Sequence, residues 1–227
     1  MLRVELHQHS CYSPDSSISY QDLLTAYEKG KFDVIAITDH DTVEGALEFK
    51  KRGDFPVIVG EEITLPGYKD VIGLFLNETV PHSLPLAETI SIIKKQGGLV
   101  LVPHPFNRFK LGISEAAILE NIDNIDLFEA YNAAGGNLIN RNQLAVEFAD
   151  KHNLVKVACS DAHFRDQIGT TVTIVNSNDA NKLLTPNGLM EALEGCKYEL
   201  KFNTFLQHLI KRLFYIVKMD IYRRTNY

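Results

Sequence analysis

Histidines and carboxylates recur in this chain at the ends of short apolar runs. In an extended segment, residues i and i+2 project to the same side, so the pair His7 and His9 can hold one ion, and Asp161 and His163 can contribute to one cluster. A carboxylate such as Glu62 has two oxygens and can bridge two cations. Imidazole and carboxylate ligands without thiolates suit Zn²⁺, Mn²⁺ or Fe²⁺ better than Ca²⁺. Five segments carry this pattern: residues 7–9, 38–41, 60–62, 103–105 and 160–163. They predict a divalent metal centre whose ion is not specified by the residues.

The elements that must position these side chains are short strands alternating with helices. Helices are predicted at residues 19–29, 86–96 and 139–153. The predicted strands cover residues 2–6, 34–38, 57–62, 71–76, 99–103, 125–131, 155–160 and 172–175. The alternation predicts parallel strands joined by crossover helices, in an α/β fold of the small (β/α) barrel type whose strand carboxyl ends carry the chemistry. An open doubly wound sheet has the same local pattern and is the alternative.

Composition limits the classes of protein that the chain can belong to. It has 227 residues, of which 45% are hydrophobic and 23% charged, as expected for one compact domain over residues 1–203. The net charge of −6 argues against binding of duplex nucleic acid, although a mononucleotide or a short single strand remains compatible.

Three widely spaced cysteines without a C-x-x-C pair predict neither disulfides nor a thiolate zinc site, so we expect a reducing, cytoplasmic location. No window is apolar enough to predict a membrane span or a signal peptide. The oligomeric state is not predicted.

The last residues, 204–227, differ from the rest of the chain. Residues 201–227 hold six basic residues against one acid, a net charge of +5, and their apolar residues recur at helical spacing. We therefore predict a basic amphipathic C-terminal helix. It either packs on the barrel or docks on a membrane surface or a protein partner.

The motifs together resemble the polymerase and histidinol phosphatase (PHP) family of metal-dependent phosphoesterases. The resemblance covers about residues 2–176 and rests on H-x-H, T-D-H-D, G-x-E, H-P and S-D-A-H occurring in this order. It implies a distorted (β/α)7 TIM-like barrel. It further implies that His7, His9, Glu62 and Asp161 hold one metal, and that Asp15, His40 and His163 hold another.

Family members with three metals hold the third through the bridging glutamate, the H-P histidine and a fourth-strand histidine. Here Glu62 and His104 match the first two, but residues 71–77 contain no histidine. We therefore expect two divalent ions (Mn, Zn or Fe) and a third only if substrate phosphate and water complete its site.

Other residues are expected around the metals. Glu129 and Asn132 resemble residues that lie near the site in a free-standing subgroup of the family, and Asp39 is expected to accept an imidazole N–H. Arg108, Arg141 and Arg165 follow strand ends and are candidate phosphate contacts, because guanidinium binds phosphate in bidentate fashion. His82, His152 and His208 are interpreted as surface or packing residues.

These residues and the resemblance predict hydrolysis of a phosphate ester by a metal-bridging hydroxide. Asp161 would accept the proton, and His163 or a bound water would protonate the leaving group. The expected substrate is a small phosphorylated molecule, with nucleotides among the candidates. The alternatives are a short-range 3'-5' nuclease, a histidinol-phosphatase-like enzyme and a non-catalytic metal-binding docking module. The large helical insertion of nucleotide-cleaving relatives does not fit between Leu76 and His104.

Overall fold

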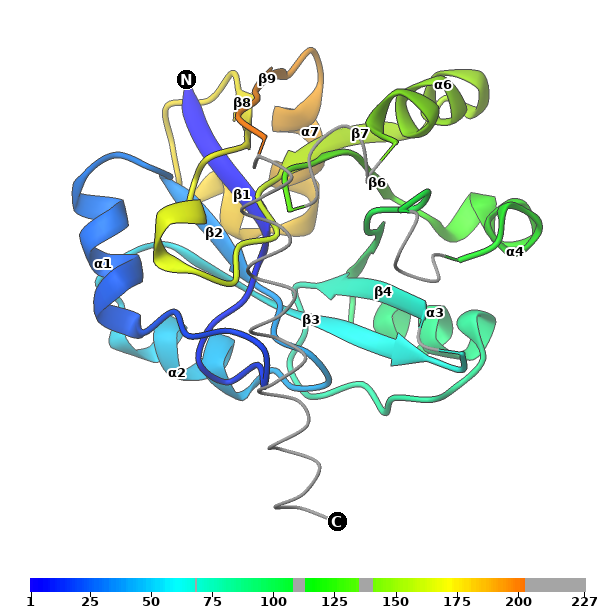
Figure 1. Ribbon diagram of the computed structural model, residues 1–227, viewed down its shortest axis with the longest axis horizontal. Helices are drawn as coiled ribbons and strands as arrows, with labels where there is room; N and C mark the ends of the chain where they lie inside the picture. The colour runs from blue at the N-terminus through cyan, green and yellow to red at the C-terminus, as the bar shows by residue number, and fades with distance from the viewer. Residues whose placement is uncertain (68, 108–112, 135–140, 203–227) are drawn as a thin grey trace.

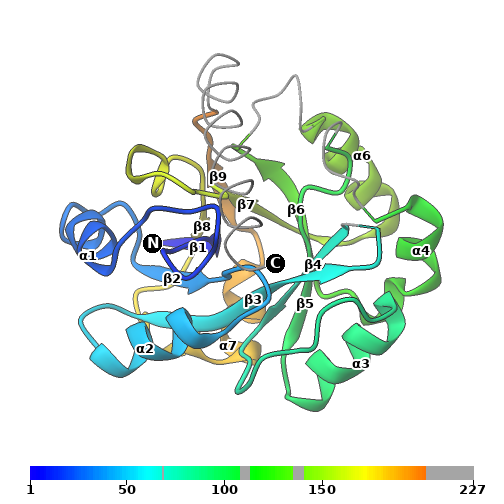
Figure 2. The ribbon, with the colours of Figure 1, turned by 60° about the horizontal axis from the view of Figure 1, so that its bottom comes forward.

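A single nine-stranded sheet organises the protein. The computed structural model describes residues 1–67, 69–107, 113–134 and 141–202. The strands lie in the order β7-β6-β5-β4-β3-β2-β1-β8-β9 and curl into a nearly closed barrel (Figures 1 and 2). Their bounds are β1 Leu2–Gln8, β2 Val34–Ile37, β3 Val57–Leu65, β4 Lys69–Leu74, β5 Leu99–Val102, β6 Leu127–Asn132, β7 Val155–Cys159, β8 Val172–Val175 and β9 Lys197–Glu199. The predicted barrel-like α/β fold is therefore confirmed.

Helices surround the strands, as Figure 2 shows for α1, α2, α3, α4 and α6. The helices are α1 Tyr20–Glu28, α2 Glu44–Arg52, α3 Leu86–Lys95, α4 Glu115–Glu120, α6 Asn142–His152 and α7 Pro186–Leu193, with short 3-10 turns η1 Ile122–Asn124, η2 Arg165–Gln167 and η3 Lys182–Leu184. The starts of α1 and α3 agree with the prediction within one residue. Helix α1 begins where Ser19 and Asp22 form a capping box, which supplies the first backbone N–H groups with acceptors.

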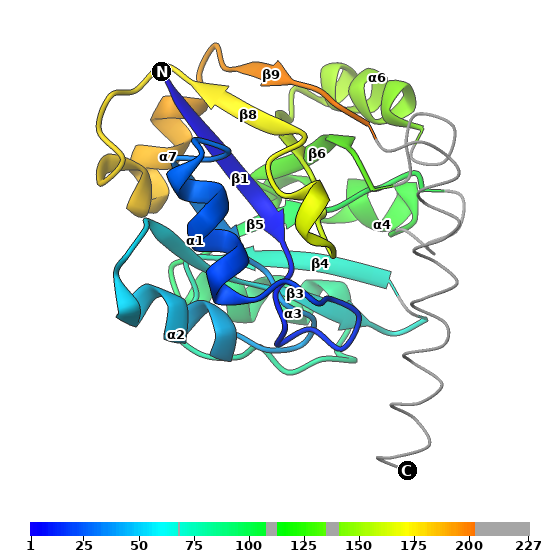
Figure 3. The ribbon, with the colours of Figure 1, turned by 60° about the vertical axis from the view of Figure 1, so that its left-hand side comes forward.

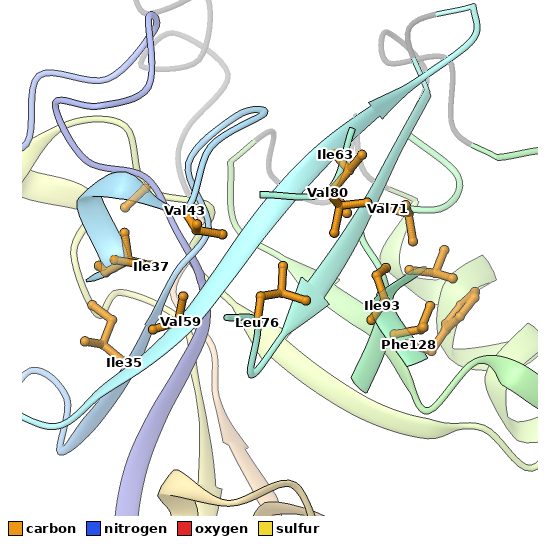
Figure 4. Packing of buried hydrophobic residues seen from close by; sticks show 14 of the residues in the cluster. Ile35, Ile37, Val43, Val59, Ile63, Val71, Leu76, Val80, Ile93 and Phe128 are labelled. Carbon is orange, nitrogen blue, oxygen red and sulfur yellow. The ribbon is translucent and has the colours of Figure 1, made fainter. Parts of the chain in front are cut away.

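Two apolar layers hold the sheet in place. Alternate strand residues such as Ile35, Val59 and Val71 face the outer helices, and Figure 4 shows this packing. The opposite faces contribute Val34, Ile58 and many others to a second cluster, which includes Leu189 and other α7 residues. Because apolar side chains cover both faces of the central strands, a strand such as β2 consists of consecutive apolar residues.

The prediction that the strands are parallel is wrong for β4 and β8. Strand β4 runs antiparallel to both β3 and β5, because only a tight turn containing Pro66 and Gly67 separates β3 from β4. A parallel pair needs a crossover of about a dozen residues or more, which this turn cannot supply. Strand β8 pairs antiparallel with β1, and the three-residue β9, which was not predicted, pairs with β8 (Figure 3).

The barrel closes near the carboxyl ends of β1 and β7. Gln8 forms a parallel bridge with Ala162, and the Asp161 amide donates to the carbonyl of His7 over 3.1 Å. Below this bridge, the Glu5 carboxylate accepts from the amide of Ser160, and burial raises the pKa of Glu5 to about 8. Closure of the barrel therefore brings the carboxyl end of β1, with the H-x-H motif, next to the carboxyl end of β7, with the S-D-A-H motif.

The C-terminal segment 204–227 lies outside the described residues, so the predicted amphipathic helix and the domain boundary stay predictions. Within the described ranges, we find no helix with the length and apolar character that crossing a bilayer requires.

Candidate metal centre

The structure brings together the imidazoles and carboxylates that the sequence singled out, and it adds Asp70 to them. Most of these side chains are buried. The cluster contains His7, His9, Asp15, His40, Glu62, Asp70, His104, Asp161 and His163, which fall into four overlapping groups whose ligand atoms lie within 4.8 Å of one another. Such a density of ligand-type atoms fits the binding of more than one ion.

Glu62 lies at the centre of this arrangement. Its Oε2 is 3.1 Å from His9 Nε2 and 3.3 Å from His7 Nε2. The same oxygen is 3.5 Å from His40 Nε2, whereas Oε1 is 3.0 Å from His104 Nε2. The two carboxylate oxygens thus face different imidazoles, as a bridging ligand requires.

A second group forms around Asp15. Its Oδ2 is 2.8 Å from His163 Nε2 and 3.5 Å from His40 Nε2, and His9 belongs to the same group. Asp15 is only 6% exposed, and within the described part of the chain its Oδ1 has no hydrogen-bond partner. Buried polar atoms are normally paired, so an oxygen left over among imidazoles fits a cation.

Asp161 connects the two sides of the centre. Its Oδ1 lies 3.5 Å from His7 Nε2, 3.4 Å from His9 Nε2 and 3.4 Å from His163 Nδ1. The residue adopts a left-handed backbone with φ 48°, and His104 is also at positive φ. Non-glycine residues hold such strained conformations mainly where the surroundings fix a functional side chain.

Electrostatics show that the centre favours positive charge. Burial opposes protonation of His7, yet Asp161, Glu62 and Glu129 hold its pKa well above 6.5. Burial likewise opposes protonation of His40, but Glu62 and Asp15 raise its pKa to about 10. For Asp15, burial opposes ionisation, and the imidazoles of His163 and His40 still hold its pKa well below 3.8. Protons on these imidazoles balance the buried carboxylates, and divalent cations would do so in their place.

Comparison with known proteins identifies the family. The chain is 36% identical to the uncharacterized protein MJ1587 of Methanocaldococcus jannaschii over 148 residues, which are 59% of this chain and 85% of that protein. The family model described as PHP-associated matches residues 140–195. The chain belongs to the PHP family.

Solved structures agree with the PHP fold. A two-domain protein of Bacteroides vulgatus, described as containing a predicted PHP-like metal-dependent phosphoesterase, superimposes with a TM-score of 0.69 at 20% identity. That match covers 88% of this chain, which spans 64% of the length of the two-domain protein. PsfC of Pseudomonas syringae matches with a TM-score of 0.68 at 15% identity, over 96% of this chain and 99% of PsfC. At these identities the likeness concerns the fold.

A hydrogen-bonded frame holds the candidate ligands of this PHP domain. Glu129 Oε1 is 3.1 Å from His7 Nδ1, and Glu129 Oε2 accepts from the His104 amide. Asn132 Nδ2 donates to Glu129 Oε2 over 3.0 Å and to Asp161 Oδ2 over 3.1 Å. Carboxylates that hold the second nitrogen of a ligating imidazole fix its orientation and its tautomer. The sequence placed Glu129 and Asn132 near the site, and the structure shows which side chains they hold.

Asp39 does not have the partner expected for it. Its carboxylate accepts from the amide and the hydroxyl of Ser10, at 2.6 and 2.7 Å, and no imidazole of the described residues donates to it. Ser13 provides the contact instead, because its Oγ lies 3.0 Å from His9 Nδ1 and accepts from the His40 amide. Serines in a loop carry no metal-binding signature, so sequence reasoning missed this role.

Two of the three arginines expected at the phosphate lie in the described part of the chain. Arg108 lies outside the described residues. Arg141 is exposed and takes a left-handed backbone conformation at the start of α6. Arg165 has a side chain 69% exposed, and its Nε lies 3.4 Å from Asp22 of α1. A phosphate contact for any of them stays a prediction.

Asp70 joins the centre without having been predicted. It groups with His40 and Glu62 within the same 4.8 Å limit. The ligand that the resemblance implied for the fourth strand was a histidine, and residues 71–77 contain none. Since β4 runs antiparallel, its beginning, not its end, lies beside the carboxyl end of β2.

Proposed function

We propose that this PHP domain hydrolyses the phosphate ester of a small phosphorylated molecule with the help of two or three divalent metal ions. The observation that carries the proposal is the position of Glu62, whose two oxygens face four imidazoles from different parts of the chain. The proposed ligands are His7, His9, Glu62 and Asp161 for one ion, and Asp15, His40 and His163 for another, with His104 on the far oxygen of Glu62.

The metals would supply two effects when bound: a lower pKa for a coordinated water, and neutralisation of the phosphate oxygens. The protein's own contribution is the rigid frame around them. Asn132 holds Asp161 Oδ2 while Oδ1 faces the imidazoles. This arrangement supports the proposed role of Asp161 as the acceptor of the proton of the attacking water.

His163 fits a ligand role better than a general-acid role. Its Nδ1 lies 3.0 Å from the Asp161 carbonyl, and its Nε2 faces Asp15. Both ring nitrogens are therefore engaged inside the centre, and we propose that the leaving group takes its proton from solvent.

Substrate would approach from the side of His40 and His163. Their side chains are 21% and 16% exposed, whereas those of His7, His9 and His104 are at most 1% exposed. The buried imidazoles can therefore hold ions while the two outer ones border solvent, as an open catalytic metal site requires.

The test is phosphate release by purified protein loaded with Mn²⁺, Zn²⁺ or Fe²⁺. We expect hydrolysis of p-nitrophenyl phosphate or of one member of a panel of sugar phosphates, nucleotides and bisphosphates, and loss of that activity in Glu62→Gln. The panel includes histidinol phosphate and short RNA and DNA, so that a histidinol phosphatase or a nuclease gives a distinct result. Metal-loaded protein without activity on the whole panel would favour the docking-module alternative.

A further inference from the structure

The two pairs of candidate ligands, His7 with His9 and Asp161 with His163, come from strands that are not neighbours in the sheet. Strand β1 lies between β2 and β8, whereas β7 is the strand at one end of the order. His7 Nε2 nevertheless lies 3.5 Å from Asp161 Oδ1. Contacts other than a regular strand ladder must therefore set the spacing of the two pairs.

Glu5 of β1 makes contacts of this kind. Its side chain is completely buried, and its Oε1 accepts from the backbone N–H of His7 over 3.1 Å. The backbone nitrogen of Ser160 donates to the same carboxylate and lies 3.0 Å from Oε2 and 3.3 Å from Oε1. Ser160 directly precedes Asp161 in the chain. One carboxyl group thus holds the backbone of a candidate ligand in β1 and the backbone beside a candidate ligand that follows β7.

The pairing of β1 with β2 is irregular at this point. Glu5 pairs with Ile35 of β2. The next pair joins Gln8 to Ile37, so three steps along β1 match two steps along β2. An extra residue of this kind lies outside the regular ladder, as in a β-bulge. The β1–β2 ladder therefore does not fix His7, and the bond to Glu5 gives the His7 N–H a defined partner.

The burial of Glu5 also needs these two donors. Moving a carboxyl group out of water is unfavourable unless hydrogen bonds compensate it. Among the described residues, Glu5 belongs to none of the groups whose ligand atoms lie within 4.8 Å of one another, so direct coordination of a metal does not account for it. The backbone N–H groups of His7 and Ser160 do account for it.

We propose that Glu5 is a positioning residue of the metal centre, whose carboxyl group sets the spacing of the two ligand pairs by accepting one backbone N–H from each side. The inference rests on the metal centre of the proposed function but not on the identity of the substrate. Oε1 alone lies within hydrogen-bonding distance of both backbone nitrogens, at 3.1 and 3.3 Å. One oxygen is therefore enough, and the role depends on hydrogen bonding and not on charge.

Three variants of the full chain test this role. Glu5→Leu removes both acceptor oxygens, whereas Glu5→Gln keeps one oxygen in a side chain of the same length. Thr173→Val is the matched control. Thr173 of β8 is buried, and its Oγ1 accepts from the N–H of Ala158 in β7 over 2.9 Å and donates to the carbonyl of Ala158 over 3.1 Å. The control therefore removes another side-chain contact to β7, but not one beside a candidate ligand.

Each protein is stripped with chelator, and calorimetry measures its affinity for Mn²⁺ and Zn²⁺. The absorption spectrum of Co²⁺-loaded protein reports the coordination geometry, and urea unfolding of metal-free protein reports the stability. We expect Glu5→Leu to bind metal at least about tenfold more weakly and to change the Co²⁺ spectrum. Glu5→Gln should restore most of the affinity and the wild-type spectrum. Thr173→Val should lower the stability but keep the wild-type affinity and spectrum.

Wild-type affinity and spectrum in folded Glu5→Leu overturn the proposal. An equal loss of affinity in Thr173→Val also overturns it, because the cause would then be the stability of the barrel. An equal loss in Glu5→Gln overturns it as well, because the cause would then be the charge. If Glu5→Leu does not fold, Glu5→Asp takes its place, since its carboxyl group is one methylene shorter and should not reach both N–H groups.

These measurements need no substrate, so they separate this inference from the proposed function. Weaker metal binding in Glu5→Leu, with the controls as expected, supports the role of Glu5 even if the wild-type protein hydrolyses no phosphate ester. Hydrolysis by the wild-type protein together with unchanged metal binding in Glu5→Leu keeps the proposed function and rejects the role of Glu5.

Discussion

The side-chain amide of Asn132 joins two carboxylates of the metal centre, since its Nδ2 lies 3.1 Å from Asp161 Oδ2 and 3.0 Å from Glu129 Oε2. Glu129 in turn lies 3.1 Å from His7 Nδ1. Asn142, at the start of α6, holds the backbone of Asn132. Its side chain accepts from the backbone N–H of Asn132 and donates to the backbone carbonyl of Asn132. Asn132 of β6 therefore orients Asp161, a candidate ligand. It also orients Glu129, the carboxylate that contacts the candidate ligand His7.

This relationship makes Asn132 a positioning residue. In Asn132→Ala both carboxylates lose a donor, and groups that orient metal ligands are commonly worth 10–100-fold. We expect metal affinity to fall roughly tenfold or more, with a comparable loss in kcat/KM. Calorimetry of metal binding and steady-state kinetics check this, with the exposed Asn124→Ala as control. An affinity equal to that of the control would contradict the role.

Glu62→Gln tests the bridging carboxylate. The amide keeps the size of the side chain but removes its charge and one acceptor, so its four imidazole neighbours lose the group they share. We expect at least one metal equivalent to be lost and activity to fall more than about 100-fold. Metal counting and phosphate release on the same preparation measure both effects. Glu78→Gln, on an exposed loop, is the control, and full metal content in Glu62→Gln would be inconsistent with bridging.

The candidate ligands were accessible from sequence because they are chemically distinctive and occur at strand ends. His7, His9, Glu62 and His163 could be recognised from i, i+2 spacing and ordered motifs, and the structure brings them into one cluster. Asp70 could not be found in this way, because its place depends on the direction of β4. Strand β4 runs antiparallel to β3 because a short turn at Pro66 and Gly67 joins them. The alternation of strands and helices does not reveal such a turn.

Contacts made by common polar side chains were also missed. The Ser13 hydroxyl contacts His9 and the backbone amide of His40, and the Ser10 hydroxyl donates to Asp39. Neither serine belongs to a sequence motif that would indicate this contact. Such contacts arise from loop conformation, which depends on tertiary packing more than on local sequence. The short strand β9 was missed for a similar reason, because three mostly exposed residues show no apolar period.

Ser13→Ala is expected to destabilise the protein. The change removes the hydroxyl that His9 Nδ1 and the His40 amide both contact, and leaving buried polar groups without a partner costs about 1–3 kcal/mol. Urea unfolding of metal-free protein should show a decrease of that order. Ser17→Ala, at an exposed position of the same loop, is the control. Equal stability of the two variants would show that water replaces the hydroxyl.

The pH dependence of metal stabilisation has a definite sign. Burial opposes protonation of His40, but Glu62 and Asp15 raise its pKa from 6.5 to about 10. In metal-free protein this proton stabilises the fold fully below pH 6.5, and its contribution is lost as the pH rises through about 10. A bound cation replaces the proton and competes with it. The extra stability that Mn²⁺ confers should therefore increase as the pH rises from about 6.5 to about 9.

Urea unfolding at several pH values, with excess Mn²⁺ or with chelator, measures this difference. Taking the difference between the two conditions cancels groups that do not touch the metals, such as buried Glu5, whose raised pKa of about 8 affects both. His40→Ala should flatten the pH dependence, whereas His82→Ala, on an exposed loop, should preserve it. A metal-dependent stability that stays constant or decreases with pH in the wild-type protein would mean that protons and cations do not compete for these imidazoles.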